Sequence, residues 1–251
     1  MKIFKIILIS SIVLLACKSV EKTAQNNLTI YCVGDSTMAT KVNPDKNPEY
    51  GWAQVLPEFL KSDIKIENAA KNGRSTKSFI DEKRWDSVYV KLKKGDYVFI
   101  EFGHNDEKKE DPKCFTEPYT TYKTNLEKFV KESRSKGAIP VLFTSIVRRD
   151  FDESGKIKYT HGNYTVVTLL VAKELNVPMV DMENLTKKLE ESYGVEGSKK
   201  LHLHYAIGED PYYPKGHNDD THLSKLGAMK VAGLAVNALK KEVPVLNKFI
   251  K

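Results

Sequence analysis

The sequence predicts a doubly wound α/β domain built on a parallel sheet of about five strands. Short segments rich in Val, Ile, Phe and Tyr alternate with helical patterns from Leu28 to the C-terminus. These short segments are apolar throughout, which is typical of strands whose two faces are both covered. Regular alternation of such strands with helices favours a parallel sheet packed between helices.

The individual elements follow from these patterns. The strand candidates are bounded by Gly, Asn, Asp or Pro and span residues 28–33, 64–69, 97–102, 139–144 and 178–181. The helix candidates span residues 52–60, 86–92, 122–136, 164–175, 185–193 and 224–239. The longest irregular stretches are residues 40–51, 107–121 and 202–221, and loops of such length in a compact domain are usually functional or disordered.

Residues 1–16 have the features of a signal peptide. Lys2 and Lys5 lie at the start, and the apolar run at 6–15 is too short to cross a hydrocarbon layer of ~30 Å. The sequence Leu14-Leu15-Ala16-Cys17 that follows resembles the bacterial lipobox, whose cysteine becomes the lipid-modified first residue of the mature protein.

The lipobox resemblance implies a periplasmic or cell-surface lipoprotein that touches the membrane only through a lipid anchor on Cys17. Residues 17–27 would then form a tether and residues 28–251 a single globular domain of ordinary size. The leaflet that holds the anchor depends on the envelope of the host. No feature of the sequence defines an oligomeric state.

The net charge places weak limits on binding partners. The formal net charge of +7 becomes about +5 when Lys2 and Lys5 are removed (7 minus 2). An acidic partner is compatible with this balance, but the lysines are scattered, so an ordinary soluble surface explains it and nucleic-acid binding gets no support.

Cys32 is expected in the core, whereas Cys114 lies in a polar stretch, and the pattern leaves open whether the two are bridged.

A serine follows the first predicted strand directly, in Gly34-Asp35-Ser36-Thr37. Backbone N–H groups at a strand-to-helix turn can stabilise the negative charge that develops in acyl transfer. By itself, the tripeptide Gly-Asp-Ser is better explained as a turn with a helix cap.

A candidate base lies just before the last predicted helix. A serine hydroxyl needs a base to take its proton, and His222 is the side-chain type best tuned for that near neutral pH. Asp219, three residues earlier, is expected to reach His222 across a helical turn and to orient its ring, whereas Asp220 should point elsewhere. An Asp-rich loop with Ser224 as helix cap would explain the same residues without catalysis.

Two further segments follow the second and third predicted strands. Gly73, in Asn72-Gly73-Arg74-Ser75, would let the backbone approach a ligand closely and offer its N–H. Asn105, in Gly103-His104-Asn105-Asp106, would bring a side-chain amide to the same sheet edge. Each segment also has a plain loop-building explanation, and their co-occurrence at one edge favours the functional one.

These four segments match, in order, the Ser, Gly, Asn and His blocks of the SGNH hydrolases, also called GDSL-type esterases. Further segments resemble the rhamnogalacturonan acetylesterase branch over most of the chain from Leu28 to the last helix. They are Tyr50-Gly51-Trp52, Arg148-Arg149-Asp150-Phe151, Thr160-His161-Gly162-Asn163-Tyr164 and Tyr213-Pro214-Lys215-Gly216.

The resemblance implies a three-layer α/β/α sandwich and a cofactor-free, metal-independent hydrolysis of acetyl esters on a pectic polysaccharide. By this resemblance Ser36 is the nucleophile, His222 the base and Asp219 the group that orients the base. The oxyanion hole would consist of the Ser36 and Gly73 backbone N–H groups and the Asn105 amide. The substrate is expected to be acidic, and the polysaccharide and acetyl position stay open.

Substrate-binding candidates flank the same edge. Arg74, Arg148 and Arg149 are placed to pair with a uronate carboxylate, although surface solvation explains them as well. Aromatic residues in the loops suit stacking on sugar rings, namely Tyr50, Trp52, Tyr119, Tyr205, Tyr212 and Tyr213. His202 and His204, where relatives favour bulkier residues, raise the idea of a metal site, which we set aside because no ligand spacing is completed.

Two rival functions remain at this stage. An esterase, thioesterase or lysophospholipase of the same superfamily would act on acyl chains and would need an apolar tunnel, whereas the loops here are polar and aromatic. A surface lipoprotein that binds glycan without catalysis is the alternative from another class. Chain-length preference and labelling of Ser36 by a fluorophosphonate would separate these functions from a deacetylase.

Overall fold

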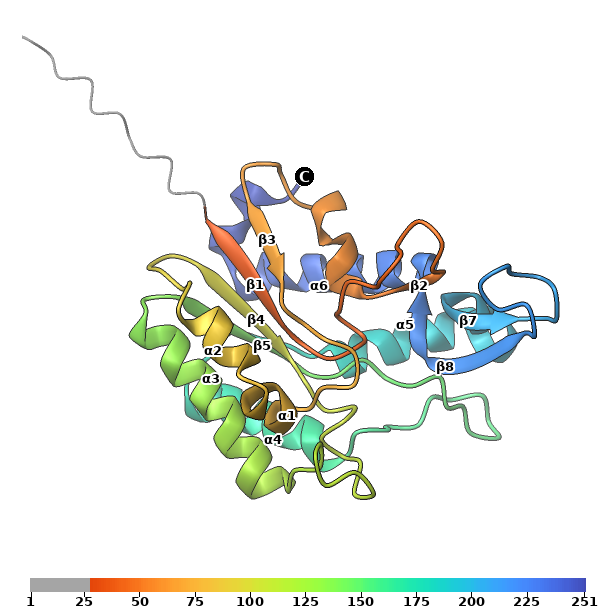
Figure 1. Ribbon diagram of the computed structural model, residues 1–251, viewed down its shortest axis with the longest axis horizontal. Coiled ribbons are helices and arrows are strands. Elements are labelled where there is room, and N and C mark those ends of the chain that lie inside the picture. The colour runs from red at the N-terminus through yellow and green to blue at the C-terminus, as the bar shows by residue number, and fades with distance from the viewer. Residues whose placement is uncertain (1–27) are drawn as a thin grey trace, which may run out of the picture.

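The computed structural model describes residues 28–251, which form a parallel sheet covered by helices on both faces (Figure 1). The sheet has the order β3-β1-β4-β5-β6, and its neighbouring strands all pair in parallel. These strands are β1 (Thr29–Gly34), β3 (Lys65–Asn68), β4 (Tyr97–Glu101), β5 (Ile139–Phe143) and β6 (Met179–Val180). The α/β class and the five predicted strands are confirmed.

Alternate residues of β1 explain the three layers. Ile30 and Cys32 point into one apolar cluster, and Tyr31 and Val33 point into the other. The first cluster is covered by η1 (Trp52–Glu58), α5 (Met182–Gly197) and α6 (Lys225–Glu242). The second is covered by α1 (Thr76–Asp81), α2 (Arg84–Tyr89), α3 (Lys123–Ser135) and α4 (Asn163–Glu174). The three-layer α/β/α prediction is therefore confirmed (Figure 1).

Several helices differ in type or length from the prediction. The segment predicted as a helix at 52–60 is a 3-10 helix, η1, with Pro57 inside it, and proline cannot donate the backbone bond of an α-helix. Helix α1 was not predicted, and it begins at a capping box between Ser75 and Ser78. A π-helical turn, η2 (Pro118–Tyr122), leads directly into α3. The remaining turns are the 3-10 helices η3 (Ser198–Leu201) and η4 (Pro244–Phe249).

A second, antiparallel sheet includes the two ends of the stretch predicted as irregular at 202–221, and residues 206–216 between them are irregular as predicted. It has the order β2-β8-β7, formed by β2 (Glu49–Tyr50), β7 (His202–Tyr205) and β8 (His217–Ser224). The sequence pattern missed it because β8 is polar and because its partners are distant in the chain. This small sheet lies beside the main sheet, near the end of β1 (Figure 1).

The strand order puts a crevice at the end of β1. The chain runs from β1 to β3 on one side and then crosses to β4 on the other side. Loops that leave neighbouring strands in opposite directions at such a point open a ligand-binding crevice at the carboxyl edge. The segments that contain Ser36, Gly73 and Asn105 follow β1, β3 and β4 and meet there.

The predicted signal peptide (1–16), the tether (17–27) and the modified Cys17 lie outside the described residues. Within residues 28–251, none of the helices has the length and apolar character that a bilayer span requires.

Candidate active site

Ser36 lies in the turn that leaves β1 and is 6% exposed. The Asp35 carboxylate accepts hydrogen bonds from the Thr37 backbone N–H and hydroxyl, both at 2.9 Å. The Thr37 carbonyl in turn accepts the backbone N–H of Trp52, at 2.9 Å, which anchors the turn on η1. These bonds hold the backbone on the carboxyl side of Ser36, whose side chain lines the crevice.

The structure brings Ser36, His222 and Asp219 together. His222 Nε2 lies 2.9 Å from Ser36 Oγ, and His222 Nδ1 lies 2.7 Å from Asp219 Oδ2. Because a carboxylate only accepts, Nδ1 donates to Asp219, which leaves Nε2 to accept the hydroxyl proton of Ser36. This arrangement can deprotonate a serine as it attacks an ester.

Asp219 meets His222 through a strand irregularity and not through the predicted helical turn. Both residues belong to β8, and Asp219 Oδ1 accepts the backbone N–H groups of Thr221 (2.8 Å) and His222 (2.9 Å). Burial alone would raise the pKa of Asp219, but the hydrogen bonds from His222 outweigh it and hold this pKa below its ordinary value. Asp219 is therefore ionised at neutral pH and can stabilise an imidazolium.

Three hydrogen-bond donors converge beside Ser36. Gly73 has a φ of +75°, a backbone conformation that favours glycine. Within residues 28–251, the backbone N–H groups of Ser36 and Gly73 have no hydrogen-bond acceptor. The Asn105 amide donates one N–H to the Arg74 carbonyl, at 3.1 Å, and its second N–H stays available. The predicted oxyanion-hole residues thus lie together in the crevice.

Lys41 is a buried cation that the sequence patterns did not reveal. It is 4% exposed, its ammonium donates to the Ser36 carbonyl and to Asn72 Oδ1 (3.0 Å), and it pairs with Glu49 at 2.6 Å. Burial lowers the pKa of Lys41, an effect that Glu49 partly offsets. Lys41 therefore joins the nucleophile turn to the Asn72–Gly73 turn. A lone lysine in a polar loop carries no signal for this role.

The crevice is a cleft of about 330 Å³. The lining consists of Ser36, Asn72, Gly73, His104, Asn105, Lys108, Arg148, Thr221 and His222. Of the four predicted substrate-binding residues, Arg148 is the one that lines it. Lys108, which also lines it, was not predicted, and its ammonium donates to Asn105 Oδ1 at 2.8 Å.

The other three predicted substrate-binding residues are engaged elsewhere. Trp52 is fully buried, and its indole N–H donates to Glu101, so the prediction that Trp52 stacks on a sugar is wrong. The Arg74 guanidinium pairs with Glu82 at 3.0 Å, outside the cleft. Tyr213 stacks on the ring of His217, with centroids 4.2 Å apart, in an aromatic group beside the cleft.

The remaining basic and sulfur-bearing candidates have structural partners. Arg149 pairs with Asp220 at 2.7 Å and does not line the cleft. His204 Nε2 lies 2.8 Å from Asp220, and within residues 28–251 no cluster of three or more potential ligands forms a metal site. Cys32 and Cys114 are both buried and unbridged.

Comparisons with known proteins agree on the similarity of this chain to one family of hydrolases. The profile of the GDSL-like Lipase/Acylhydrolase family matches residues 30–234. Rhamnogalacturonan acetylesterase RhgT of Bacillus subtilis (strain 168) is 40% identical over 214 residues, which cover 85% of this chain and 90% of RhgT. The probable rhamnogalacturonan acetylesterase YesY of the same organism is 34% identical, over 88% of this chain and 97% of YesY.

A solved structure shows a similar fold. The crystal structure of the protein YxiM from Bacillus subtilis superposes with a TM-score of 0.71 at 25% identity, and the match covers 86% of this chain and 57% of that one. The family profile spans the sheet, the serine turn and the first half of the last helix. The chain belongs to the GDSL-like lipase/acylhydrolase family.

Proposed function

We propose that this protein is a serine esterase that removes acetyl groups from a rhamnogalacturonan-type pectic polysaccharide. The observation that carries the proposal is the hydrogen-bonded series Ser36–His222–Asp219, whose Ser36 and His222 line one cleft together with Gly73 and Asn105. The similarity to RhgT, over most of both chains, supports the substrate class. The small volume of the cleft, about 330 Å³, favours an acetyl group over a long acyl chain.

The proposed reaction has two halves. The Ser36 hydroxyl oxygen attacks the ester carbonyl carbon while its proton moves to His222 Nε2, and the oxyanion accepts the Ser36 and Gly73 N–H groups and the Asn105 amide. Collapse breaks the bond to the sugar oxygen, which takes the proton from His222 and leaves an acetylated Ser36. Water, deprotonated by His222, then releases acetate and restores the serine.

Two cations in the cleft support an acidic substrate. Arg148 lines the cleft and pairs with Glu107, and Lys108 lines it beside Asn105. A uronate carboxylate next to the acetylated position would meet both charges, and arginine suits a carboxylate because it can donate two parallel hydrogen bonds. We therefore expect an acidic polymer to be deacetylated in preference to a neutral one.

The test is acetate release from acetylated rhamnogalacturonan and acetylated xylan by the full chain and by Ser36→Ala. We expect release from the pectic polymer, slower release from xylan, and none from the variant. Nitrophenyl acetate should be cleaved in preference to nitrophenyl butyrate. Acetate release that survives Ser36→Ala would rule out the serine mechanism. Labelling of Ser36 by a fluorophosphonate without release from any glycan would keep the esterase and reject the substrate.

Localisation is a separate part of the proposal. The lipobox-like Leu14-Leu15-Ala16-Cys17 supports export, cleavage before Cys17 and attachment of lipid to that cysteine. Expression in a bacterial host with labelled palmitate should mark the wild-type chain and should not mark Cys17→Ser. Equal labelling of both chains, or of neither, would contradict the anchor.

A further inference from the structure

The pairing of β7 with β8 is irregular where β8 carries Asp219 and His222. His202 of β7 pairs with Leu223, whereas the next residue, Leu203, pairs with Asp219. One step along β7 therefore corresponds to four along β8, and the three residues between Asp219 and Leu223 have no partner strand residue. Such a bulge bends the strand and redirects its side chains. It puts the Asp219 and His222 side chains within hydrogen-bond distance of each other.

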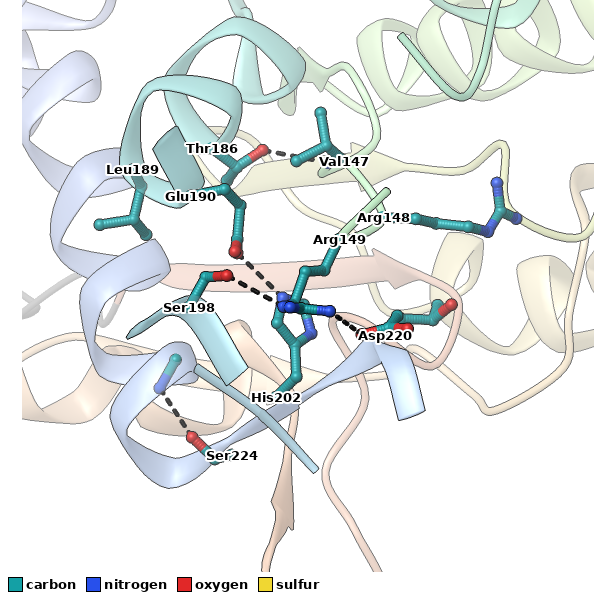
Figure 2. A network of polar contacts seen from close by, with 12 residues as sticks. Val147, Arg148, Arg149, Thr186, Leu189, Glu190, Ser198, His202, Asp220 and Ser224 are labelled. Atoms are coloured by element: carbon teal, nitrogen blue, oxygen red, sulfur yellow. Dashed lines mark hydrogen bonds and ion pairs between the residues drawn. The ribbon is translucent and has the colours of Figure 1, made fainter. Parts of the chain in front are cut away.

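Groups outside the sheet ladder satisfy the backbone of this bulge. The Arg149 backbone N–H donates to the Asp220 carbonyl at 2.7 Å, and the Arg149 guanidinium pairs with the Asp220 side chain. The His222 carbonyl lies 3.1 Å from Nδ1 of His202. The backbone of His222 is thus held by the imidazole of another histidine, which Figure 2 shows beside Arg149 and Asp220.

His202 is itself fixed by Glu190 of α5. His202 Nε2 lies 2.9 Å from Glu190 Oε1, and both residues are 2% exposed (Figure 2). A carbonyl oxygen only accepts, so Nδ1 of His202 bears a proton that it donates to His222. One further proton lies between His202 Nε2 and Glu190 Oε1.

We propose that Glu190 and His202 are positioning residues, which hold the His222 carbonyl so that Nε2 of His222 faces Ser36 Oγ. This inference rests on the proposed function, in which His222 is the base. The hydrogen bond fixes the peptide plane that follows His222, and this plane sets the direction of the His222 side chain. Displacement of a catalytic group by about 1 Å can cost about a hundredfold in rate, so a weakened bulge should lower turnover.

Two substitutions at His202 separate positioning from simple stability. His202→Asn keeps a donor at the place of Nδ1, toward His222, and loses the contact with Glu190. His202→Gln reaches toward Glu190 and loses the bond to the His222 carbonyl. The measurements on the purified full chain are kcat and KM for nitrophenyl acetate, the rate of Ser36 labelling by a fluorophosphonate, and Tm.

We expect His202→Gln to lower kcat and the labelling rate by about ten- to a hundredfold, with KM changed less than about twofold. His202→Asn should retain both rates within about threefold, although its Tm falls. Equal losses in the two variants, or rate losses that follow Tm alone, would overturn the proposal. Wild-type activity in His202→Gln would overturn it as well.

A second pair of variants at Glu190 covers the case in which His202→Gln does not fold. Glu190→Gln can still donate to Nε2 of His202 and should keep the labelling rate within about threefold, whereas Glu190→Leu should lower it about tenfold. Equal rates in these two variants would reject the role of Glu190. If the wild type releases no acetate from pectin, the substrate assignment fails, and the ratio of labelling rates still decides the positioning role. A wild-type chain without Ser36 labelling would reject both.

Discussion

At the scale of single residues, the surroundings of each side chain decide its part in the site. Asp219 and Asp220 are neighbours in sequence, yet Asp219 accepts from His222 while Asp220 pairs with Arg149. Lys41, with no motif of its own, contacts both the Ser36 carbonyl and the Asn72 side chain. Chemistry that depends on these residues is therefore open to test by single substitutions.

Asp219→Asn is expected to lower kcat by about four orders of magnitude. An asparagine amide can donate to Nδ1 of His222 and so favour the tautomer whose Nε2 carries a proton, which cannot accept from Ser36. Steady-state kinetics with nitrophenyl acetate measure the effect. The matched control is Asp220→Asn, which should lose less than about tenfold because Asp220 does not contact His222 through its side chain. Similar losses in both variants would contradict the assignment of Asp219.

Lys41→Met is expected to destabilise the fold by about 3–5 kcal/mol, because it leaves the carboxylate of Glu49 without its buried partner. Urea unfolding of the purified chain measures the change. The double variant Lys41→Met/Glu49→Leu should recover part of the loss, since no charge is then left unpaired. Additive losses from the two single substitutions would argue against a coupled pair.

At the scale of elements, the small sheet and α6 join at β8. Ser224 ends β8 and caps α6, where its hydroxyl accepts the Gly227 N–H at 3.1 Å and donates to the Lys200 carbonyl at 2.7 Å. The first turn of α6 therefore packs directly on the backbone of η3. This close contact keeps the strand with Asp219 and His222 attached to a helix of the main core.

The two glycines of α6 provide a matched test of that contact. A Cβ at Gly227 would lie 2.0 Å from the Leu201 carbonyl oxygen, whereas one at Gly233 would meet Phe59 at 3.4 Å. Alanine favours a helix over glycine by about 1 kcal/mol, so Gly233→Ala should raise stability by up to about that amount. Gly227→Ala should lower the stability, although alanine has the same advantage in helix propensity at this position. Thermal and urea unfolding of both variants measure the change in stability. A Gly227→Ala variant that is more stable than the wild type would contradict the close contact with the Leu201 carbonyl.

At the scale of the whole molecule, two fully buried acids lie at the end of β4 and in the loop after it, which carries His104 and Asn105 of the cleft. Burial, with a smaller contribution from Asp35, raises the pKa of Glu101 to about 8. Burial likewise raises the pKa of Asp106 to about 7. Both carboxyl groups retain a proton in the folded chain over a pH range where the unfolded chain has lost it. Their contribution to stability is therefore largest at low pH.

Stability is expected to fall as pH rises from about 4.5 to about 8 through the contribution of Glu101. The folded state binds more protons than the unfolded state over this window, so the free energy of unfolding decreases with pH. Urea unfolding at several pH values gives the free energy of unfolding as a function of pH. The slope of this free energy against pH should be shallower for Glu101→Gln than for the wild type. The comparison concerns the slope, because glutamine also changes the bonds to Trp52 and Thr37. Parallel slopes would contradict the raised pKa.

The sequence by itself determined the main sheet and the position of each loop at the site. The strands are local apolar runs. Because they are parallel, the loops with Ser36, Gly73 and Asn105 lie at one edge of the sheet, independently of side-chain contacts. Local motif spacing also indicated the family, which the match over residues 30–234 confirms. These features depend on patterns within a few residues, which a single sequence displays.

Only the tertiary structure decided how the site is supported. The β7–β8 bulge, the Glu190–His202 pair and the Lys41 contacts join residues that are distant in sequence, and no local pattern marks such partners. Trp52 illustrates the same limit, because an aromatic residue at the boundary between a predicted loop and a predicted helix proved to be buried core. Burial and hydrogen-bond partners are properties of the packed molecule, since each depends on which distant segments meet. The sequence therefore identified the reacting groups, whereas the residues that hold them in place are identified only by the packed structure.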